Sequence, residues 1–186
     1  MLIKNKKTLF NIFCIFAFLF CSNVKSEEFD ISAKEIVIDK EKETIIGKDS
    51  RKSIDSSGKI ITADKIVYDK LKEFILAEGN VEILDIEGNI LKSNRATYNK
   101  LKELIITYDY TEFSLSDGYK LKSRDILYNV KDKILSSKNS AIFTDSENNS
   151  IETSMFQYNL NENLFTSIGK IKVIDMKKNK YFFKEI

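Results

Sequence analysis

The sequence contains no histidine, no tryptophan and no proline, and only 6 glycines among its 186 residues. Without histidine, the chain has no Ser-His-Asp or Cys-His nucleophile system and lacks a ligand that most zinc sites require. The absence of proline and the scarcity of glycine exclude collagen-like repeats and proline-rich linkers. Chemistry based on carboxylates, lysine or tyrosine stays open, but we expect a protein that is not an enzyme and that needs no metal or cofactor.

Residues 1–26 have the layout of a secretory signal peptide. A basic start at 4–7 precedes 13 mostly apolar residues at 9–21, and a polar stretch ends at Ser26. An apolar run of this length is short of the roughly 20 residues that span a bilayer. We therefore expect cleavage before Glu27 and export out of the cytoplasm, with an uncleaved anchor as the alternative.

Removal of this leader changes the charge and the cysteine content. Four of the 30 basic residues lie within residues 1–26, so the exported chain has 26 basic residues against 28 acids. The slight positive charge of the whole chain therefore gives no argument for nucleic acid as a partner. Cys14 and Cys21 leave with the leader, which predicts a domain without thiols or disulfides.

The strongest feature of the sequence is a repeat of 30 residues. Tyrosine recurs at this spacing, and Asp or Asn follows each tyrosine. Two apolar columns and one column of small residues keep the same period. Five copies of the repeat follow one another without an insertion. They predict a stack of five structural units, which we call rungs and which begin near residues 28, 58, 88, 118 and 148. The columns are Tyr68, Tyr98, Tyr128 and Tyr158; Ile45, Ile75, Ile105, Leu135 and Phe165; Ile83, Phe113, Phe143 and Val173; and Ala33, Ala63, Ser93, Ser123 and Thr153.

Each rung is typical of β-strands rather than helices. Short alternating segments rich in Ile, Val, Tyr and Phe are separated by turn residues such as Gly79-Asn80. Ile66 and Tyr68 lie on even positions, whereas Ile61 and Ala63 lie on odd ones, so we expect a bulge or corner near Asp64-Lys65. The prediction is an all-β stack in which like positions of successive rungs lie on one another.

A sixth unit opens after Lys177. We expect the domain to cover residues 27–186 and to end inside this unit, so that the chain is the front of a longer protein or leaves an edge for a partner. The candidate partner edges are the two end strands, because each has one side without a neighbour in the chain. Their apolar residues are Phe29 and Ile31 in the first, and Tyr181, Phe182 and Phe183 in the last.

These motifs resemble the OstA-like family of the lipopolysaccharide-transport system. The resemblance runs from about Glu28 to the end and is most specific at Ala63-Asp64, Tyr68-Asp69 and Ala77-Glu78-Gly79-Asn80-Val81. It is weaker in the first unit, where residues 47–51 depart from the pattern. The end of the chain is most similar to the N-terminal periplasmic domain of the outer-membrane assembly protein of this family, which would make the chain a fragment of a longer protein.

The resemblance implies a twisted, half-open β-jelly roll with an apolar trough. The trough would shield the acyl chains of lipopolysaccharide, and domains would join edge to edge with other OstA-like transport proteins and with the outer-membrane assembly machinery. The implied location is the periplasm, at the inner face of the outer membrane for the assembly protein. The inward columns of the middle rungs would line the trough: Ile75, Ile83, Ile105, Phe113, Leu135 and Phe143.

Simpler interpretations stay open for these features. The apolar columns could be the core of a closed structural or adhesive β-solenoid that binds no lipid. The tyrosines suit a packing ladder better than a sugar-stacking surface, and the Asp/Asn column suits turn capping better than calcium. The lysine-rich turns could contact phosphorylated lipid headgroups or only keep the turns soluble. A carbohydrate-active β-helix with paired carboxylates is the weakest alternative, because the acids recur with the turns.

Overall fold

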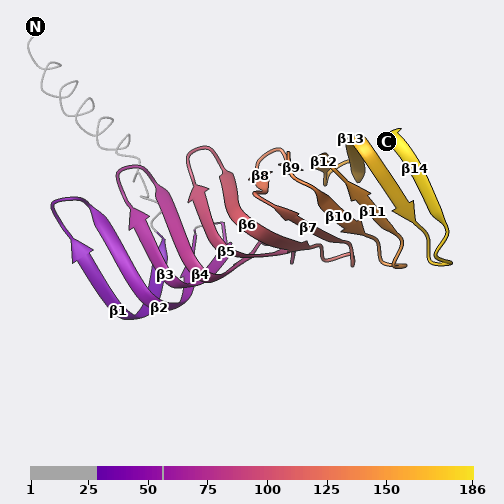
Figure 1. Cartoon of the computed structure of the whole chain (residues 1–186). Coiled ribbons are helices and arrows are strands. Elements are labelled where there is room, and N and C mark those ends of the chain that lie inside the picture. The colour runs from indigo at the N-terminus through magenta and orange to yellow at the C-terminus, as the bar shows by residue number, and fades with distance from the viewer. Residues whose placement is uncertain (1–28, 56) are drawn as a thin grey trace, which may run out of the picture.

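The computed structural model describes residues 29–55 and 57–186, which form antiparallel β-strands joined by short turns (Figure 1). The predicted signal peptide lies outside the described residues. The strands are β1 (Asp30–Asp39), β2 (Thr44–Ile54), β3 (Ile60–Asp69), β4 (Phe74–Leu84), β5 (Ile90–Asn99), β6 (Leu104–Ser114), β7 (Lys120–Arg124), β8 (Leu127–Asn129), β9 (Ile134–Ser137), β10 (Ala141–Thr144), β11 (Ser150–Thr153), β12 (Phe156–Asn159), β13 (Leu164–Ile174) and β14 (Lys180–Glu185).

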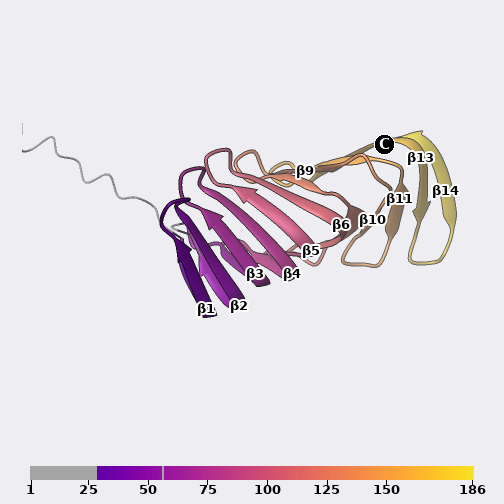
Figure 2. The same cartoon turned by 60° about the vertical axis from the view of Figure 1, so that its left-hand side comes forward.

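The strand positions repeat every 30 residues, as predicted. β1, β3 and β5 begin at residues 30, 60 and 90, and β2, β4 and β6 begin at residues 44, 74 and 104. Successive strands pair with one another along the row from β1 to β6, and the whole molecule is an elongated, twisted row of hairpins (Figure 2). The repeat is thus an antiparallel hairpin whose two strands alternate apolar and polar residues.

The expected stacking of like positions is wrong in detail. Ile75 pairs with Tyr68 on one side and with Tyr98 on the other, and Tyr98 in turn pairs with Ile105. Tyrosine and aliphatic residues therefore alternate along one ladder. The cause is the short connection between strands, which makes neighbouring strands antiparallel and places an intervening strand between equivalent positions.

A bulge bends the long strands, as predicted near Asp64-Lys65. The register of β3 against β4 shifts between Thr62 and Lys65. Opposite this shift, Gly79 (φ 75°) and Asn80 (φ 47°) adopt left-handed backbone conformations. A Cβ at Gly79 would lie 2.3 Å from the Asp64 carboxylate, so glycine is required there both for conformation and for space.

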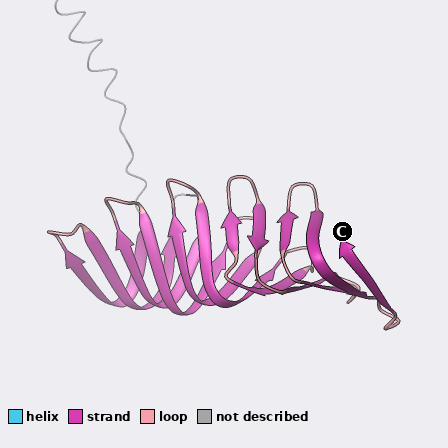
Figure 3. Ribbon diagram, turned by 45° about the horizontal axis from the view of Figure 1, so that its top comes forward, coloured by secondary structure: helices cyan, strands magenta, loops and turns pink. Residues whose placement is uncertain are grey.

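This corner divides each long strand into two halves, which form two walls. The turn wall carries the tyrosine column and ends at the turns 40–43, 70–73, 100–103, 130–133 and 160–163. The loop wall ends at the loops 55–59, 85–89, 115–119, 145–149 and 175–179. Figure 3 shows the turns in a row along one edge of the molecule.

From β7 to β12, the corner divides each long strand into two separate strands, whereas β13 runs through it. β7 and β8 are two halves of one repeat position, separated around Asp125 (φ 51°). The pairing runs β6-β7-β10-β11-β13-β12-β9-β8 and returns from β8 to β6. Eight antiparallel strands are thus closed into a β-barrel in their hydrogen-bond pattern, with β1–β5 and β14 as extra strands. The predicted all-β fold is confirmed, whereas its half-open jelly-roll form stays a prediction.

The column of small residues lies at the inner side of the corner. Here the bend interrupts the hydrogen-bond ladder between strands, and buried hydroxyl groups donate to backbone carbonyls that would otherwise lack a partner. The Ser123 hydroxyl donates to the Ser140 carbonyl at 3.1 Å, and the Thr153 hydroxyl donates to the Met155 carbonyl at 2.9 Å. Small polar side chains therefore satisfy the backbone where a larger residue would block the bend.

The Asp/Asn column caps the turns, as expected. Asp39 Oδ1 accepts from the amides of Glu41 and Lys42 at 3.1 and 3.0 Å, and Asn99 Oδ1 accepts from the Lys102 amide at 3.0 Å. The Lys42 amide is the main reason why the pKa of Asp39 lies below its ordinary value. These side chains are bound to their own turns.

Candidate functional site: the apolar interior

The structure brings the six predicted trough residues together between the two walls. Ile75, Ile105 and Leu135 project from the turn wall, and each is at most 1% exposed. The other three project from the loop wall and are at most 7% exposed. The loop-wall residues are Ile83, Phe113 and Phe143.

The interior is filled by contacts between the walls. The ring of Phe113 in the loop wall lies 5.5 Å from the ring of Tyr128 in the turn wall, in an edge-to-face arrangement. Phe143 contacts Tyr158 and Phe165 of the turn wall at 5.2 and 5.0 Å between ring centroids. The predicted lipid-facing residues therefore form a packed core in this structure, and acyl chains could enter only if the walls moved apart.

A polar cluster joins the ends of the two walls near the first rungs. Lys59 Nζ lies 3.5 Å from Asp55 Oδ2 and 3.0 Å from the Tyr98 hydroxyl, and it also lies over the Tyr98 ring. The side chains of Lys59 and Asp55 are 5% and 2% exposed. Asp55 Oδ1 accepts from the amides of Ser57 and Lys59, so this buried carboxylate has several partners.

A second contact joins the walls farther along. Lys133, in a turn, forms an ion pair with Glu87, in a loop. Together with the Lys59 cluster, this pair marks the line where the turns of one wall meet the loops of the other, which we call the seam. These contacts across the seam are made by side chains and not by a strand ladder.

The two walls are displaced by one rung. Tyr98 lies near the end of β5, which begins directly after the loop 85–89. Tyr98 nevertheless contacts Lys59, which lies in the loop before β3, one rung earlier. Phe29 packs on Tyr68 in the same way, with 4.9 Å between ring centroids. The displacement leaves interior positions uncovered at the two ends of the stack.

The uncovered positions are apolar. Ile36 and Ile38 are 47% and 61% exposed, whereas Ile66 and Tyr68, one rung later, are 0% and 3% exposed. At the other end, Tyr181 and Phe183 of β14 are 46% and 48% exposed. Of the predicted edge residues, Phe182 is also exposed, Ile31 is half-buried, and Phe29 is buried against the tyrosines.

The tyrosine hydroxyls lie close to acidic loops. Burial raises the pKa of Tyr128, and the nearby charges of Asp85 and Glu87 add to this effect. Burial, followed by the charge of Asp117 and the neighbouring Tyr119, raises the pKa of Tyr158 to about 12. The Tyr158 hydroxyl donates to Asn163 Oδ1 at 2.5 Å.

We expect the protein to lose stability as the pH rises from 10 to about 12. An unfolded tyrosine ionises near pH 10, whereas folded Tyr158 stays protonated until about pH 12, so the unfolded state releases a proton first. Tyr158→Phe removes this contribution and should give a shallower decline in the free energy of unfolding. Urea titrations across this pH range test this expectation, and an identical slope in the variant would contradict it.

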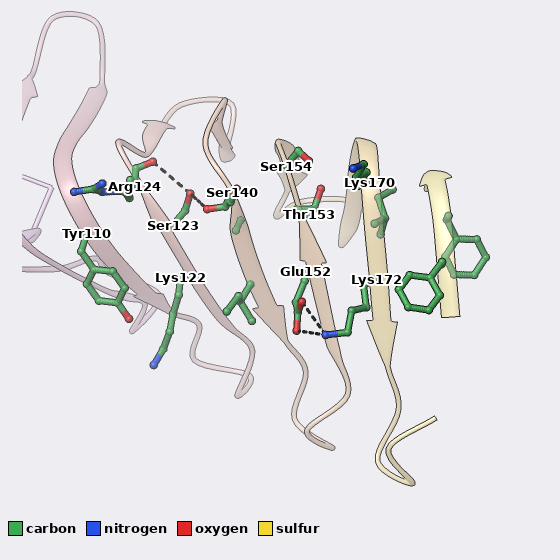
Figure 4. Close-up of a pocket in the computed structure, with 15 residues that line it drawn as sticks. Tyr110, Lys122, Ser123, Arg124, Ser140, Glu152, Thr153, Ser154, Lys170 and Lys172 are labelled. Atoms are coloured by element: carbon green, nitrogen blue, oxygen red, sulfur yellow. Dashed lines mark hydrogen bonds and ion pairs between the residues drawn. The ribbon is translucent and has the colours of Figure 1, made fainter. Parts of the chain in front are cut away.

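The outer face of the loop wall carries a shallow groove of about 680 Å³ (Figure 4). Its lining includes Tyr110, Lys122 and Arg124, and the ion pair between Glu152 and Lys172, at 2.9 Å, crosses it. The groove is also lined by the predicted edge residues Phe182 and Phe183, and it contains none of the predicted trough residues.

The described part of the chain shows no cluster of three or more potential metal-ligating side chains. Nor do residues 29–55 and 57–186 include a helix long and apolar enough to cross a bilayer. Neither result tests the expectation that the protein is not an enzyme.

No protein-family model matches this chain, and no curated protein matches it.

Proposed function

We propose that this chain is a non-catalytic, periplasmic lipid-binding bridge module. Its two walls would shield the acyl chains of lipopolysaccharide during transport to, and assembly in, the outer membrane. The observation that carries this proposal is the continuous apolar interior between walls whose seam contacts, among the described residues, are made by side chains. Burying an acyl chain there would be favourable by about 25 cal/mol per Å² of apolar surface removed from water.

The construction of the walls supports an interior that can open. Each wall is held together by strand ladders that run along the stack, whereas the seam depends on contacts such as Lys133 with Glu87. The walls could therefore separate at the seam, with bending at the corner, without loss of the backbone hydrogen bonds. This opening would convert the packed core into the half-open jelly roll that the resemblance implies.

The uncovered ends support edge-to-edge joining. Ile36 and Ile38 on the turn wall and Tyr181 and Phe183 on the loop wall are exposed at opposite ends. A neighbouring OstA-like module, or further strands of the same protein, would add to these edges and cover the apolar positions. Because these exposed residues lie on opposite walls at the two ends, the end strands of two joined modules would overlap.

A structural β-solenoid without a lipid ligand is the second candidate. The observation that favours it is the burial of the six trough residues, none of which is more than 7% exposed. In that case the interior is a permanent core, and the exposed ends serve only for assembly. The two candidates differ in whether the interior ever contacts a lipid.

Site-specific photo-crosslinking in cells that make lipopolysaccharide tests the proposal. We expect a photoreactive phenylalanine analogue at Phe113 or Ile105 to label lipopolysaccharide, because both side chains project into the interior. The same analogue at Ile86, in an exposed loop of the loop wall, or at Ile142, on the outer face of the loop wall, should not label it. Labelling at all four positions, or at none, would contradict the proposal and favour the structural solenoid.

A further inference from the structure

The outer face of the turn wall is apolar for a sheet face that no other element of residues 29–55 and 57–186 covers. Cross-strand pairs place a row of aliphatic residues on the side opposite the tyrosine column. In this row Val67 pairs with Ile46 and with Leu76, and Ile106 pairs with Leu127. The row runs through Val37, Ile46, Val67, Leu76, Thr97, Ile106 and Leu127.

A second apolar row lies nearer to the turns and leads to two exposed leucines. Phe74, Leu104 and Ile134 occupy equivalent outward positions on successive hairpins. Beyond them, Leu71 and Leu101 at the tips of neighbouring turns are 74% and 70% exposed. Equivalent tips two strands apart are separated by about 10 Å, so the leucines form a pair rather than isolated surface residues.

The outer face of the loop wall is different. Ion pairs cross its strands at Glu82 with Lys92, at 2.9 Å, and at Glu112 with Lys122, at 3.1 Å. Such alternating charges are typical of a sheet face in contact with water. The two outer faces of the molecule are therefore unequal, and the apolar one is the turn wall.

Basic residues border the apolar rows. The turns 69–73, 99–103 and 129–133 contain six lysines and four acids, and both leucine tips stand between two lysines. Asp69 forms an ion pair with Lys72, so these two charges offset each other, and the three turns keep an excess of two positive charges. The loops 85–89, 115–119 and 145–149 contain five acids and no basic residue, but they belong to the other wall.

The apolar face also continues into a groove at its C-terminal end. This groove, of about 880 Å³, is lined by Leu127, Met155, Ile168 and Ile186 together with polar residues of the same face. Leu127, Met155 and Ile168 are 39%, 43% and 64% exposed. The outer face of the turn wall thus offers apolar contacts along most of the stack.

We propose that the outer face of the turn wall docks on an anionic lipid bilayer, with Leu71 and Leu101 inserted among the headgroups. Exposed apolar side chains beside lysines are the combination that binds peripheral proteins to membranes, since the apolar groups enter the interface and the lysines meet the anionic headgroups. The acidic loops of the other wall meet the turns at the seam, where Lys133 pairs with Glu87, whereas the apolar rows face away from these loops on the outer side of the turn wall. This docking does not depend on whether the interior holds a lipid.

A fluorophore that reports on polarity, attached at a single cysteine, tests the docking in the full chain. With Cys14 and Cys21 replaced by serine, the label would be placed at Leu71→Cys or Leu101→Cys. We expect a blue shift with vesicles of phosphatidylglycerol and phosphatidylethanolamine. The shift should weaken as salt is raised and should be much smaller with phosphatidylcholine alone, because the lysines contribute through charge.

Ile86 gives a matched control. It is 72% exposed, like the two leucines, but it lies in a loop of the other wall between Asp85 and Glu87. A label at Ile86→Cys should not shift, even if residues 1–26 tether the chain to the vesicles. Absence of a shift at Leu71 and Leu101, or an equal shift at Ile86, would overturn the docking. Absence of a shift would point instead to a protein as the occupant of this face.

Discussion

Replacement of Phe113 by alanine is expected to lower the free energy of unfolding by about 3–5 kcal/mol. Phe113 is 2% exposed and lies between its cross-strand neighbours Leu91 and Leu121, with its ring against Tyr128 of the other wall. The variant loses contacts both along the loop wall and between the walls, and neighbouring strands cannot move in to fill the cavity without breaking their ladders. Urea unfolding monitored by circular dichroism measures the change.

Phe182→Ala is the control for this experiment. Phe182 is 73% exposed on β14, so its removal should change the free energy of unfolding by less than about 0.5 kcal/mol. A similar loss of stability in both variants would mean that Phe113 does not lie in a packed core. Such a result would also remove the main observation in favour of a sealed solenoid.

Replacement of Lys59 by methionine is expected to cost about 3 kcal/mol, because it leaves the buried Asp55 carboxylate without its cation. The side chains of both residues are at most 5% exposed, and Lys59 also reaches the Tyr98 hydroxyl of the other wall. Methionine has a similar volume, so the loss would report on charge and not on a cavity.

The repeat itself supplies the rescue variant. At the equivalent position of the next rung, Asn89 donates to Asp85 Oδ2 at 2.9 Å, and Asn149 donates to Asp145 Oδ2 at 2.7 Å in the same way. Lys59→Asn should therefore recover at least half of the stability that Lys59→Met loses. Equal losses in the two variants would show that the contact with Tyr98, and not the partner of Asp55, makes Lys59 important.

The period in the sequence is sufficient to predict the local structure. The spacing of Tyr68, Tyr98 and Tyr128 places strands at intervals of 30 residues, and the change of parity between Ala63 and Ile66 places the corner. The capping role of Asp39 and its equivalents follows from the same pattern. These features depend on residues close in the chain, where alternation and turn chemistry determine the backbone.

The arrangement of the two walls could not be predicted in this way. A period specifies that rungs stack, but it does not specify whether neighbouring strands alternate or by how much one wall is displaced against the other. The contact between Lys59 and Tyr98 spans 39 residues and exists only because the displacement is one rung. A lysine at a repeat position that is mostly asparagine was the available signal, since Asn89, Asn149 and Asn179 occupy three equivalent positions and Phe29 and Tyr119 the other two.

The hairpin connection between rungs has a consequence for how the protein folds. From β2 to β6, every strand pairs with the strand just before it and the one just after it in the chain. Chains with such short-range pairing close small loops and fold quickly, and folding can begin at any hairpin and spread to its neighbours. A chain that emerges from a ribosome or a translocation channel with its N-terminus first could therefore add one hairpin at a time to an existing edge. Without proline, it would also have no X-Pro isomerisation to delay this growth.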